Sequence, residues 1–374
     1  MTDLTRRFAF LNEADRLKSV DRANVLMDLS RAENSAEHSW HVALYALVFG
    51  GSDRALAMIL LHELVEIDTG DHPIHLDHDL PAVAAAEQAA ARRLFAMLPD
   101  GAPLLALWQE FEAGETDDAR FAKRVDHIQP LFQVLSAPEP LPEHLQVVRD
   151  NLAKGRAARL RDEWPDAIKA AQALLDGQPV PPGMAGPLAF LAEADRLKSV
   201  YRASELCDAS RKENSAEHSW HLALYALIMS PFATAEVQIG RVIRMLILHD
   251  LVEIDTGDVP IHAQGGAAHH SAGQMAAEDA AADRLFGMLP AALGQDLRAL
   301  WAEFEANESA DAVFAKSLDR AQPVMQNIAS GGGSWAAYDV TYDQLVERVG
   351  VRIQRGAPAL WDWLSESAQV YFQR

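Results

Sequence analysis

The 374-residue sequence contains a single cysteine, Cys207. One cysteine cannot form an internal disulfide, which fits a reducing compartment. The sequence also lacks an excess of positive charge, because its formal net charge is −21 at pH 7. A surface of this sign repels phosphate backbones, so a nucleic-acid partner is disfavoured. A small anionic substrate can still bind where a metal ion and a few arginines reverse the local field.

Long apolar segments are missing as well. No uncharged apolar stretch approaches the roughly 20 residues that a membrane helix needs. The segment MTDLTRRFAFLNEADRLK has no apolar signal core. We therefore expect a soluble, cytoplasmic protein with no membrane partner. Hydrophobic residues make up 49% of the chain, which is enough to bury a large core.

The sequence repeats itself. Residues 8–47 align with residues 188–227, and 31 of these 40 positions are identical. The match resumes between LLHELVEIDTGD (60–71) and ILHDLVEIDTGD (247–258), and again between FAKRVDHIQP (121–130) and FAKSLDRAQP (314–323). This pattern predicts a tandem duplication. We expect a first domain at 1–177, a proline- and glycine-rich linker at 178–187 and a second domain at 188–374.

The hydrophobic pattern predicts an all-α fold of two tandem helical bundles. Apolar residues recur at three- and four-residue spacing, and strand-like alternation is scarce. Asn34 with Glu37, and Asn214 with Glu217, have the spacing of a capping box at a helix start. Gly70 and Gly257 stand where the central helix of each copy should end. Trp40 and Trp220 are expected in the core.

Ionisable residues interrupt the apolar pattern of the second copy. The segment MLILHDLVEI predicts an apolar helix with His249 and Asp250 near its middle, where such groups are costly unless they are paired or bind a metal. His218 lies on a preceding predicted helix and Asp319 on a later one. The resulting order, H…HD…D, offers two imidazoles and two carboxylates. Such a set suits a divalent transition metal with coordination positions left for water and substrate.

These motifs resemble the HD-domain phosphohydrolases, and ENSAEHSW with HDLVEIDTGD is most similar to the branch of the bacterial 5'-deoxynucleotidase. The resemblance covers roughly 8–130 and 188–325. It implies two helical HD domains, a divalent metal such as Mn, Co, Fe, Ni or Zn, and release of phosphate from nucleoside 5'-monophosphates. The implied metal ligands are His218, His249, Asp250 and Asp319. The implied supporting residues are Glu253 and Asp258 for the attacking water and leaving oxygen, and Arg202 for the substrate phosphate.

The first copy departs from this pattern at one position. Its corresponding residues are the metal positions His38, His62, Glu63 and Asp126, the acids Glu66 and Asp71, and the arginine Arg22. Glu63 replaces the aspartate of the motif, and its extra methylene moves the carboxylate by about one bond length. Metal binding in the first copy therefore stays open, and we expect the better-preserved site in the second copy.

Several alternatives remain at this point. The substrate could be another phosphate, such as a nucleoside triphosphate, a cyclic dinucleotide or an alarmone. The chain could also be a metal-stabilised nucleotide sensor without catalysis. Since the resemblance implies homodimeric relatives, the two copies would form an intramolecular pseudo-dimer, and their amphipathic first segments suit its interface. His41 and His221 fit core or supporting positions better than ligand positions. Arg202, Arg196 and Lys198 could instead be solvated charges on a helix surface. The stretch 262–273 is either a lid over the site or a surface loop.

Overall fold

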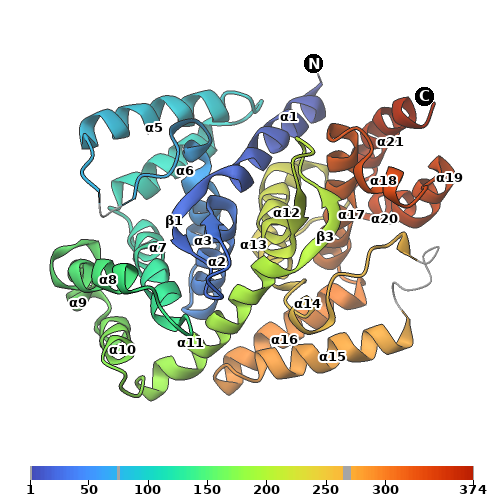
Figure 1. Cartoon of the computed structure of the whole chain (residues 1–374). Coiled ribbons are helices and arrows are strands. Elements are labelled where there is room, and N and C mark those ends of the chain that lie inside the picture. Colours follow the sequence, from blue (N-terminus) through green and yellow to red (C-terminus); the bar gives the residue numbers. More distant parts are fainter. Residues whose placement is uncertain (1, 74–75, 264–270, 374) are drawn as a thin grey trace.

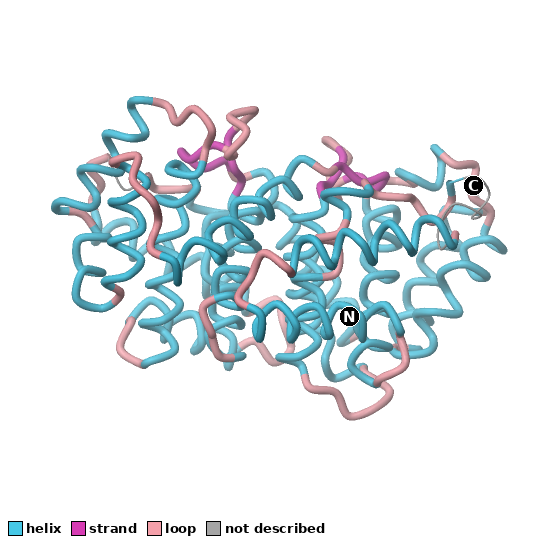
Figure 2. Tube along the Cα trace, turned by 90° about the horizontal axis from the view of Figure 1, so that it is seen from below, coloured by secondary structure: helices cyan, strands magenta, loops and turns pink. Residues whose placement is uncertain are grey.

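The computed structural model describes residues 2–73, 76–263 and 271–373. Nearly all regular structure in these residues is helical, and the strands form two small antiparallel pairs (Figures 1 and 2). The all-α prediction is confirmed, with these two pairs as an addition that the sequence pattern did not reveal. Within the described part of the chain, none of the helices combines the length and apolar character needed to cross a bilayer.

The two halves have matching elements up to α7 and α17. Repeat one comprises α1 (Asp3–Asp15), η1 (Arg16–Ser19), β1 (Asp21–Val25), β2 (Ala32–Asn34), α2 (Ser35–Val48), α3 (Asp53–Leu61), η2 (His62–Val65), α4 (Glu66–Thr69), α5 (Leu80–Phe95), α6 (Ala102–Ala113), α7 (Asp117–Ser136), α8 (Pro142–Lys154), η3 (Arg156–Arg159), α9 (Leu160–Glu163) and α10 (Pro165–Leu175). Repeat two comprises α11 (Pro182–Ala194), η4 (Asp195–Ser199), β3 (Tyr201–Glu205), β4 (Lys212–Asn214), α12 (Ser215–Met229), η5 (Ser230–Phe232), α13 (Ile239–Leu248), α14 (Glu253–Thr256), α15 (Ala272–Phe286), α16 (Ala291–Ala306), α17 (Ala310–Ala329), α18 (Gly333–Ala337), α19 (Tyr342–Leu345), η7 (Val346–Gly350), α20 (Val351–Gly356) and α21 (Pro358–Phe372).

Each strand pair leads directly into the helix that carries the first histidine of the motif. Strand β1 pairs with β2, and β3 pairs with β4. Asn34 and Asn214 end these pairs and cap α2 and α12, and both capping boxes are formed as the sequence predicts. Figure 2 shows both strand pairs on the same side of the molecule.

The predicted linker is shorter than expected, because α11 already begins at Pro182. Only residues 178–181 of the predicted stretch 178–187 lie outside helices. Proline fits the first turn of a helix, where its missing N–H has no partner to lose. The domain boundaries at 177 and 188 themselves stay predictions.

The helix predicted to run through the HD pair is broken in both repeats, so that prediction was wrong. Helix α3 ends at Leu61 and α13 ends at Leu248. A tighter turn of four residues then separates each of them from the short helix α4 or α14. The carbonyl oxygens of His62 and His249 instead accept hydrogen bonds from the indole N–H groups of Trp108 and Trp301, at 3.2 and 3.1 Å. These buried indoles satisfy backbone groups that a continuous helix would otherwise pair. Both short helices then end at glycines with a φ of +71°, as the sequence predicts.

Helices α2 and α12 lie against each other at the centre of the molecule (Figure 1). Trp40 and Trp220 are fully buried there, as expected. The Nδ2 of Asn34 donates to Glu217 at 2.6 Å, and that of Asn214 donates to Glu37 at 2.7 Å. Such reciprocal contacts are typical of an interface related by a two-fold axis.

The first helix of each repeat packs on the other repeat. Helix α1 contacts α12 and α17, whereas α11 contacts α2 and α7. Phe8 on α1 stacks on Trp363 of α21, with ring centroids 4.5 Å apart. His221 hydrogen-bonds the carbonyl of Leu11, and His41 that of Leu191, both at 3.0 Å. The two histidines are therefore buried interface residues, and each half is completed by a segment from the other.

Candidate metal centres

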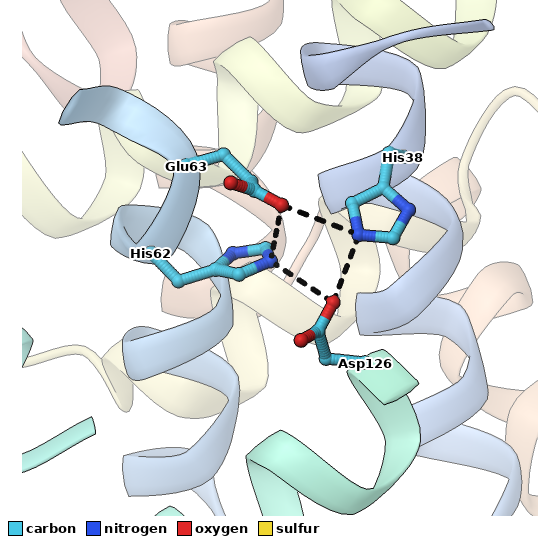
Figure 3. A group of neighbouring side chains, drawn as sticks. All are labelled: His38, His62, Glu63 and Asp126. Atoms are coloured by element: carbon cyan, nitrogen blue, oxygen red, sulfur yellow. Dashed lines mark hydrogen bonds and ion pairs between the residues drawn. The ribbon is translucent and has the colours of Figure 1, made fainter. Parts of the chain in front are cut away.

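The candidate site of repeat one is formed by three helical segments. His38 lies on α2, His62 and Glu63 lie on η2, and Asp126 lies on α7 (Figure 3). The Nε2 of His38 is 3.0 Å from Asp126 Oδ1 and 3.5 Å from Glu63 Oε1. The Nε2 of His62 is 3.3 Å from the same Glu63 oxygen and 3.6 Å from the same Asp126 oxygen. One ligand atom from each residue lies within 4.8 Å of all the others.

The outer nitrogen of each histidine fixes which nitrogen faces the centre. The Nδ1 of His38 is 3.0 Å from Gln129 Oε1, and that of His62 is 2.6 Å from the carbonyl of Ile59. Since both partners are acceptors, each Nδ1 carries the proton and each Nε2 has a free lone pair. In the described part of the chain the buried His62 Nε2 has no hydrogen-bond partner. An orphaned lone pair beside two carboxylates fits a bound cation.

The two carboxylates of the site also favour a positive charge between them. Burial lowers the pKa of His62, but Glu63 and Asp126 outweigh burial and raise it to about 10. The raised pKa of His62 reflects the negative charge of these two carboxylates, which a bound cation would balance. Ligand atoms 3.0 to 3.6 Å apart match the spacing around an ion whose bonds to nitrogen and oxygen are about 2.0–2.2 Å long. The donor set thus fits a divalent metal.

Repeat two has the same arrangement with one difference. The Nε2 of His218 is 3.2 Å from Asp319 Oδ1, and that of His249 is 3.0 Å from Asp250 Oδ1. His218 and His249 are backed by Gln322 Oε1 at 3.1 Å and by the carbonyl of Leu246 at 2.8 Å. Among the described residues His249 Nε2 likewise lacks a hydrogen-bond partner.

The set of candidate ligand atoms that all lie within 4.8 Å of one another, called here the closest group, differs between the repeats. In repeat two it contains His218, His249 and Asp250, whereas in repeat one it contains all four residues. Glu63 Oε1 lies 3.5 Å from His38 Nε2 and 3.3 Å from His62 Nε2, whereas in repeat two Asp319 lies outside the closest group. The substitution in the first copy therefore leaves four side chains that could hold a metal ion.

An arginine on the first strand of each repeat lies among the acids. Arg22 Nη1 is 2.8 Å from Glu63, 3.8 Å from Glu66 and 3.9 Å from Asp71. Arg202 Nη1 is 2.6 Å from Asp250, 3.7 Å from Glu253 and 3.8 Å from Asp258. Both arginines lie on strands, so the alternative of a solvated helix charge is wrong for Arg202. The predicted supporting residues are thus brought together in both repeats.

The acid one turn after each HD pair is protected from ionisation. Ser35 and Ser215 donate to Glu66 and Glu253, the latter at 2.5 Å. Burial, together with Asp250, raises the pKa of Glu253 well above its usual value, and burial with Glu63 does the same for Glu66. Burial and Asp250 also raise the pKa of Asp258, although Arg202 opposes them.

A pocket opens over the site of repeat two. Its walls include Arg202, Asp250, Glu253 and Asp258 together with the basic Lys316 and Arg320. Tyr338, on the segment after α18, is 38% exposed and lines the same pocket. This wall comes from the segment after α17, whose helices have different lengths from those after α7 in repeat one. His269 and His270 of the stretch 262–273 lie outside the described residues, so the lid prediction is not addressed.

Sequence reasoning missed the residues that support the metal-site histidines from behind. They are Gln129 and Gln322, Glu33 and Glu213, and Lys18 and Lys198. Both lysines are fully buried, so the alternative of a solvated charge is wrong for Lys198. A signal was present, because all three residue types occupy the same position in both copies.

The chain was compared with known proteins. The family model described as HD domain matches residues 14–168 and 194–361. The human and bovine proteins named 5'-deoxynucleotidase HDDC2 are each 28% identical over 141 residues, which is 37% of this chain and 65% of theirs. The chain thus spans just under two thirds of these relatives. A crystal structure titled predicted metal-dependent phosphohydrolase, from Magnetospirillum magnetotacticum MS-1, is 40% identical, with a TM-score of 0.47 over 51% of this chain and 96% of that one.

The two matched regions contain both histidine–carboxylate sites and together cover most of the chain. The duplication and its family were predicted from the sequence, and both are confirmed. The chain belongs to the HD-domain family of metal-dependent phosphohydrolases and carries one HD domain in each half.

Proposed function

We propose that this protein is a cytoplasmic, metal-dependent phosphomonoesterase that releases phosphate from (deoxy)nucleoside 5'-monophosphates. The observation that carries the proposal is the pocket of repeat two. His249, Asp250 and Asp319 lie in its wall beside Arg202 and two further basic residues. Metal ligands and cations in one pocket suit a small phosphate ester. The similarity to the 5'-deoxynucleotidases supports a nucleotide substrate.

In this proposal His218, His249, Asp250 and Asp319 hold the ion. A bound divalent ion would lower the pKa of a coordinated water and polarise a phosphoryl oxygen. Arg202 binds the substrate phosphate. Its buried Nε has no hydrogen-bond partner among the described residues, so a donor is available for an anionic oxygen.

Glu253 holds a proton near the reacting phosphate. The Ser215 hydroxyl fixes one of its oxygens, and the other lies 3.7 Å from Arg202. A carboxylic acid with a raised pKa can donate its proton to the leaving alkoxide oxygen. Asp258, which lies 3.8 Å from the same Arg202 nitrogen, accepts a proton from the attacking water. The wall with Tyr338 offers an aromatic surface to the base.

A phosphate-release assay with purified chain tests the proposal. The panel combines nucleoside 5'-monophosphates, triphosphates, a cyclic dinucleotide and an alarmone with Mn²⁺, Co²⁺ and Zn²⁺. We expect turnover of the monophosphates. Asp319→Ala should lower it at least about a hundredfold, since the ion contributes several kcal/mol to transition-state stabilisation. Asp126→Ala is the matched control in repeat one and should leave most of the turnover intact.

Two outcomes would contradict the proposal. Turnover of another phosphate with none of the monophosphates would assign a different substrate class. Tight nucleotide binding without turnover in any metal would indicate a sensor.

The two halves also form, in this proposal, an intramolecular pseudo-dimer. The reciprocal contacts of α2 with α12 and the exchange of α1 and α11 support it. A single cooperative unfolding transition of the full chain is expected, and two separate transitions would contradict the idea.

A further inference from the structure

Two lysines cross from one repeat into the other. Lys18 belongs to η1 of repeat one and is fully buried. Its Nζ donates to Glu213 Oε1 of repeat two at 2.6 Å and lies 2.9 Å from His221 Nδ1. Asp15 of its own repeat is its third partner. Lys18 therefore supplies a positive charge to the interior of the other half.

Lys198 of η4 makes the reciprocal contacts in repeat one. Its Nζ donates to Glu33 Oε1 at 2.7 Å and to Asp195 at 2.5 Å, and it lies 3.0 Å from His41 Nδ1. The two exchanged lysines therefore occupy equivalent environments on either side of the interface.

Neither environment is a further metal site. The groups Asp15, Glu213 and His221, and Glu33, His41 and Asp195, have a composition that suits a metal ion. In both groups, however, a lysine ammonium hydrogen-bonds both carboxylates and approaches the histidine. The cation of each group is the lysine itself.

A short chain of hydrogen bonds leads from Lys18 to a metal-site histidine. Glu213 Oε1 accepts from Gln322 Nε2 at 2.9 Å as well as from Lys18. With its amide N–H₂ held by a carboxylate, Gln322 presents Oε1 to His218 Nδ1 at 3.1 Å. That contact places the His218 proton on Nδ1 and the lone pair on Nε2, which faces Asp319.

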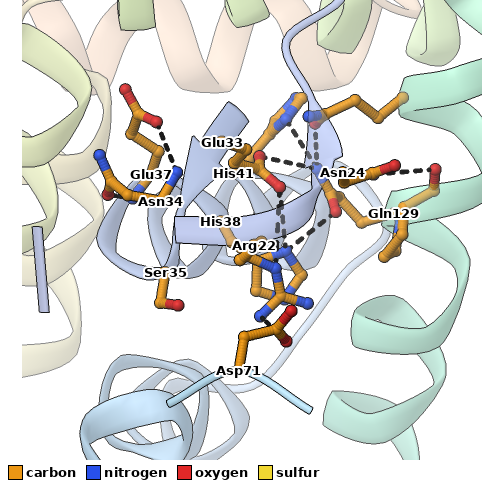
Figure 4. A network of polar contacts seen from close by, with 12 residues as sticks. Arg22, Asn24, Glu33, Asn34, Ser35, Glu37, His38, His41, Asp71 and Gln129 are labelled. Carbon is orange, nitrogen blue, oxygen red and sulfur yellow. Dashed lines mark hydrogen bonds and ion pairs between the residues drawn. The ribbon is translucent and has the colours of Figure 1, made fainter. Parts of the chain in front are cut away.

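The equivalent chain in repeat one runs from Lys198 through Glu33 and Gln129 to His38. Figure 4 shows Glu33, His38, His41 and Gln129 side by side. The contact between Gln129 Nε2 and Glu33 Oε1 is longer, at 3.5 Å. Gln129 Nε2 also donates to Gln133 Oε1 at 2.6 Å, and the same oxygen accepts from Lys198 at 3.1 Å, so in repeat one the lysine reaches Gln129 by two routes.

Removing the lysine would leave Glu213 as a buried carboxylate without its nearest cation. Such a group turns away from its present partners, because an unpaired buried charge is costly. Once Glu213 has moved, the Gln322 amide would no longer be held in one orientation by that carboxylate. A flipped amide would offer N–H₂ to His218 Nδ1 and favour the tautomer whose Nε2 cannot bind a metal.

We propose that each repeat supplies the lysine that positions a metal-binding histidine of the other repeat, Lys18 for His218 and Lys198 for His38. Both lysines are positioning residues, because they reach the metal site only through a glutamate and a glutamine. Each site is thus incomplete without the opposite half. The inference deepens the proposed function, since it concerns the metal site on which that function rests.

Co²⁺ titration of the full chain tests this inference, with visible absorption as the readout. A His62→Ala background reports the site of repeat two, and a His249→Ala background reports that of repeat one. Lys18→Met and Lys198→Met are introduced into each. We expect Lys18→Met to weaken Co²⁺ binding ten- to a hundredfold in repeat two only. Lys198→Met should weaken it in repeat one only.

Three results would overturn the inference. They are unchanged affinity, equal weakening of both sites by either variant, and weakening confined to the repeat that carries the lysine. If Lys18→Met does not fold, Glu213→Gln is measured in the same backgrounds, since it keeps Lys18 paired with Asp15. A loss of affinity confined to repeat two supports the inference, and any other result contradicts it. Because no nucleotide is present, the outcome is independent of the proposed reaction.

Discussion

Phe8 tests whether the first helix of the chain stabilises the second repeat. The Phe8 side chain is 1% exposed. It stacks on Trp363 at a centroid distance of 4.5 Å and meets the edge of Tyr225 at 6.4 Å, and both partners belong to repeat two. Truncating a fully buried phenylalanine to alanine costs about 3–5 kcal/mol, and loss of the aromatic pairs falls within that total. We expect Phe8→Ala to lower the free energy of unfolding by about 4 kcal/mol.

Urea denaturation gives the total loss, and hydrogen exchange locates it. Amides of α12 and α21 should exchange faster in Phe8→Ala, although the substitution lies in repeat one. Leu80→Ala is the control, because Leu80 is 67% exposed and should change stability by less than about 0.5 kcal/mol. A loss below about 1 kcal/mol, or faster exchange confined to α1, would refute the assignment of α1 to the core of repeat two.

Three further predictions concern buried groups. Burial and Lys18 lower the pKa of His221 to about 3, so His221 stays neutral in the folded chain while it takes up a proton below about pH 6.5 when unfolded. Between pH 7 and pH 5 the wild type should therefore lose about 2 kcal/mol more stability in urea titrations than His221→Gln, and equal losses would contradict the assignment. Burial and Asp15 raise the pKa of the Cys207 thiol. Iodoacetamide at pH 8 should therefore label Cys207 slowly in the native chain and rapidly in urea. Rapid labelling of the native chain would contradict the burial of this thiol. Glu63→Asp should weaken Co²⁺ binding about tenfold in the His249→Ala background, because the shorter side chain retreats from His38. Equal or tighter binding would contradict the role given to the longer side chain.

Features that depend on local spacing were predictable from the sequence. The capping residues Asn34 and Asn214 have their acid three positions later, and the glycines that end the short helices have no side chain to oppose a positive φ. The candidate ligand set was predictable because the H…HD…D order is present in the second copy, and the first copy repeats it with Glu63 in the aspartate position. The capping and glycine signals lie within short stretches of sequence, and the ligand order can be read along the chain, so neither needed knowledge of the tertiary fold.

The features that were missed depend on contacts between distant segments. The hydrophobic period continues through His62 and His249, and the helix breaks there because indoles from α6 and α16 take up the released carbonyls. Lys198 has the pattern of a surface charge, and it is buried because η4 faces the acids of the other repeat. Periodicity describes one segment at a time and cannot show which repeat a segment will pack against.

The exchange of α1 and α11 has a consequence for synthesis on the ribosome. Repeat one leaves the exit tunnel first, yet the helix that covers α2 and α7, and the lysine that neutralises Glu33, are encoded after it. A nascent first half consequently shows uncovered apolar surface and an unbalanced interior acid until translation has passed Lys198. Because both halves belong to one polypeptide, that interval is short, and α11 is synthesised next to the half that it covers.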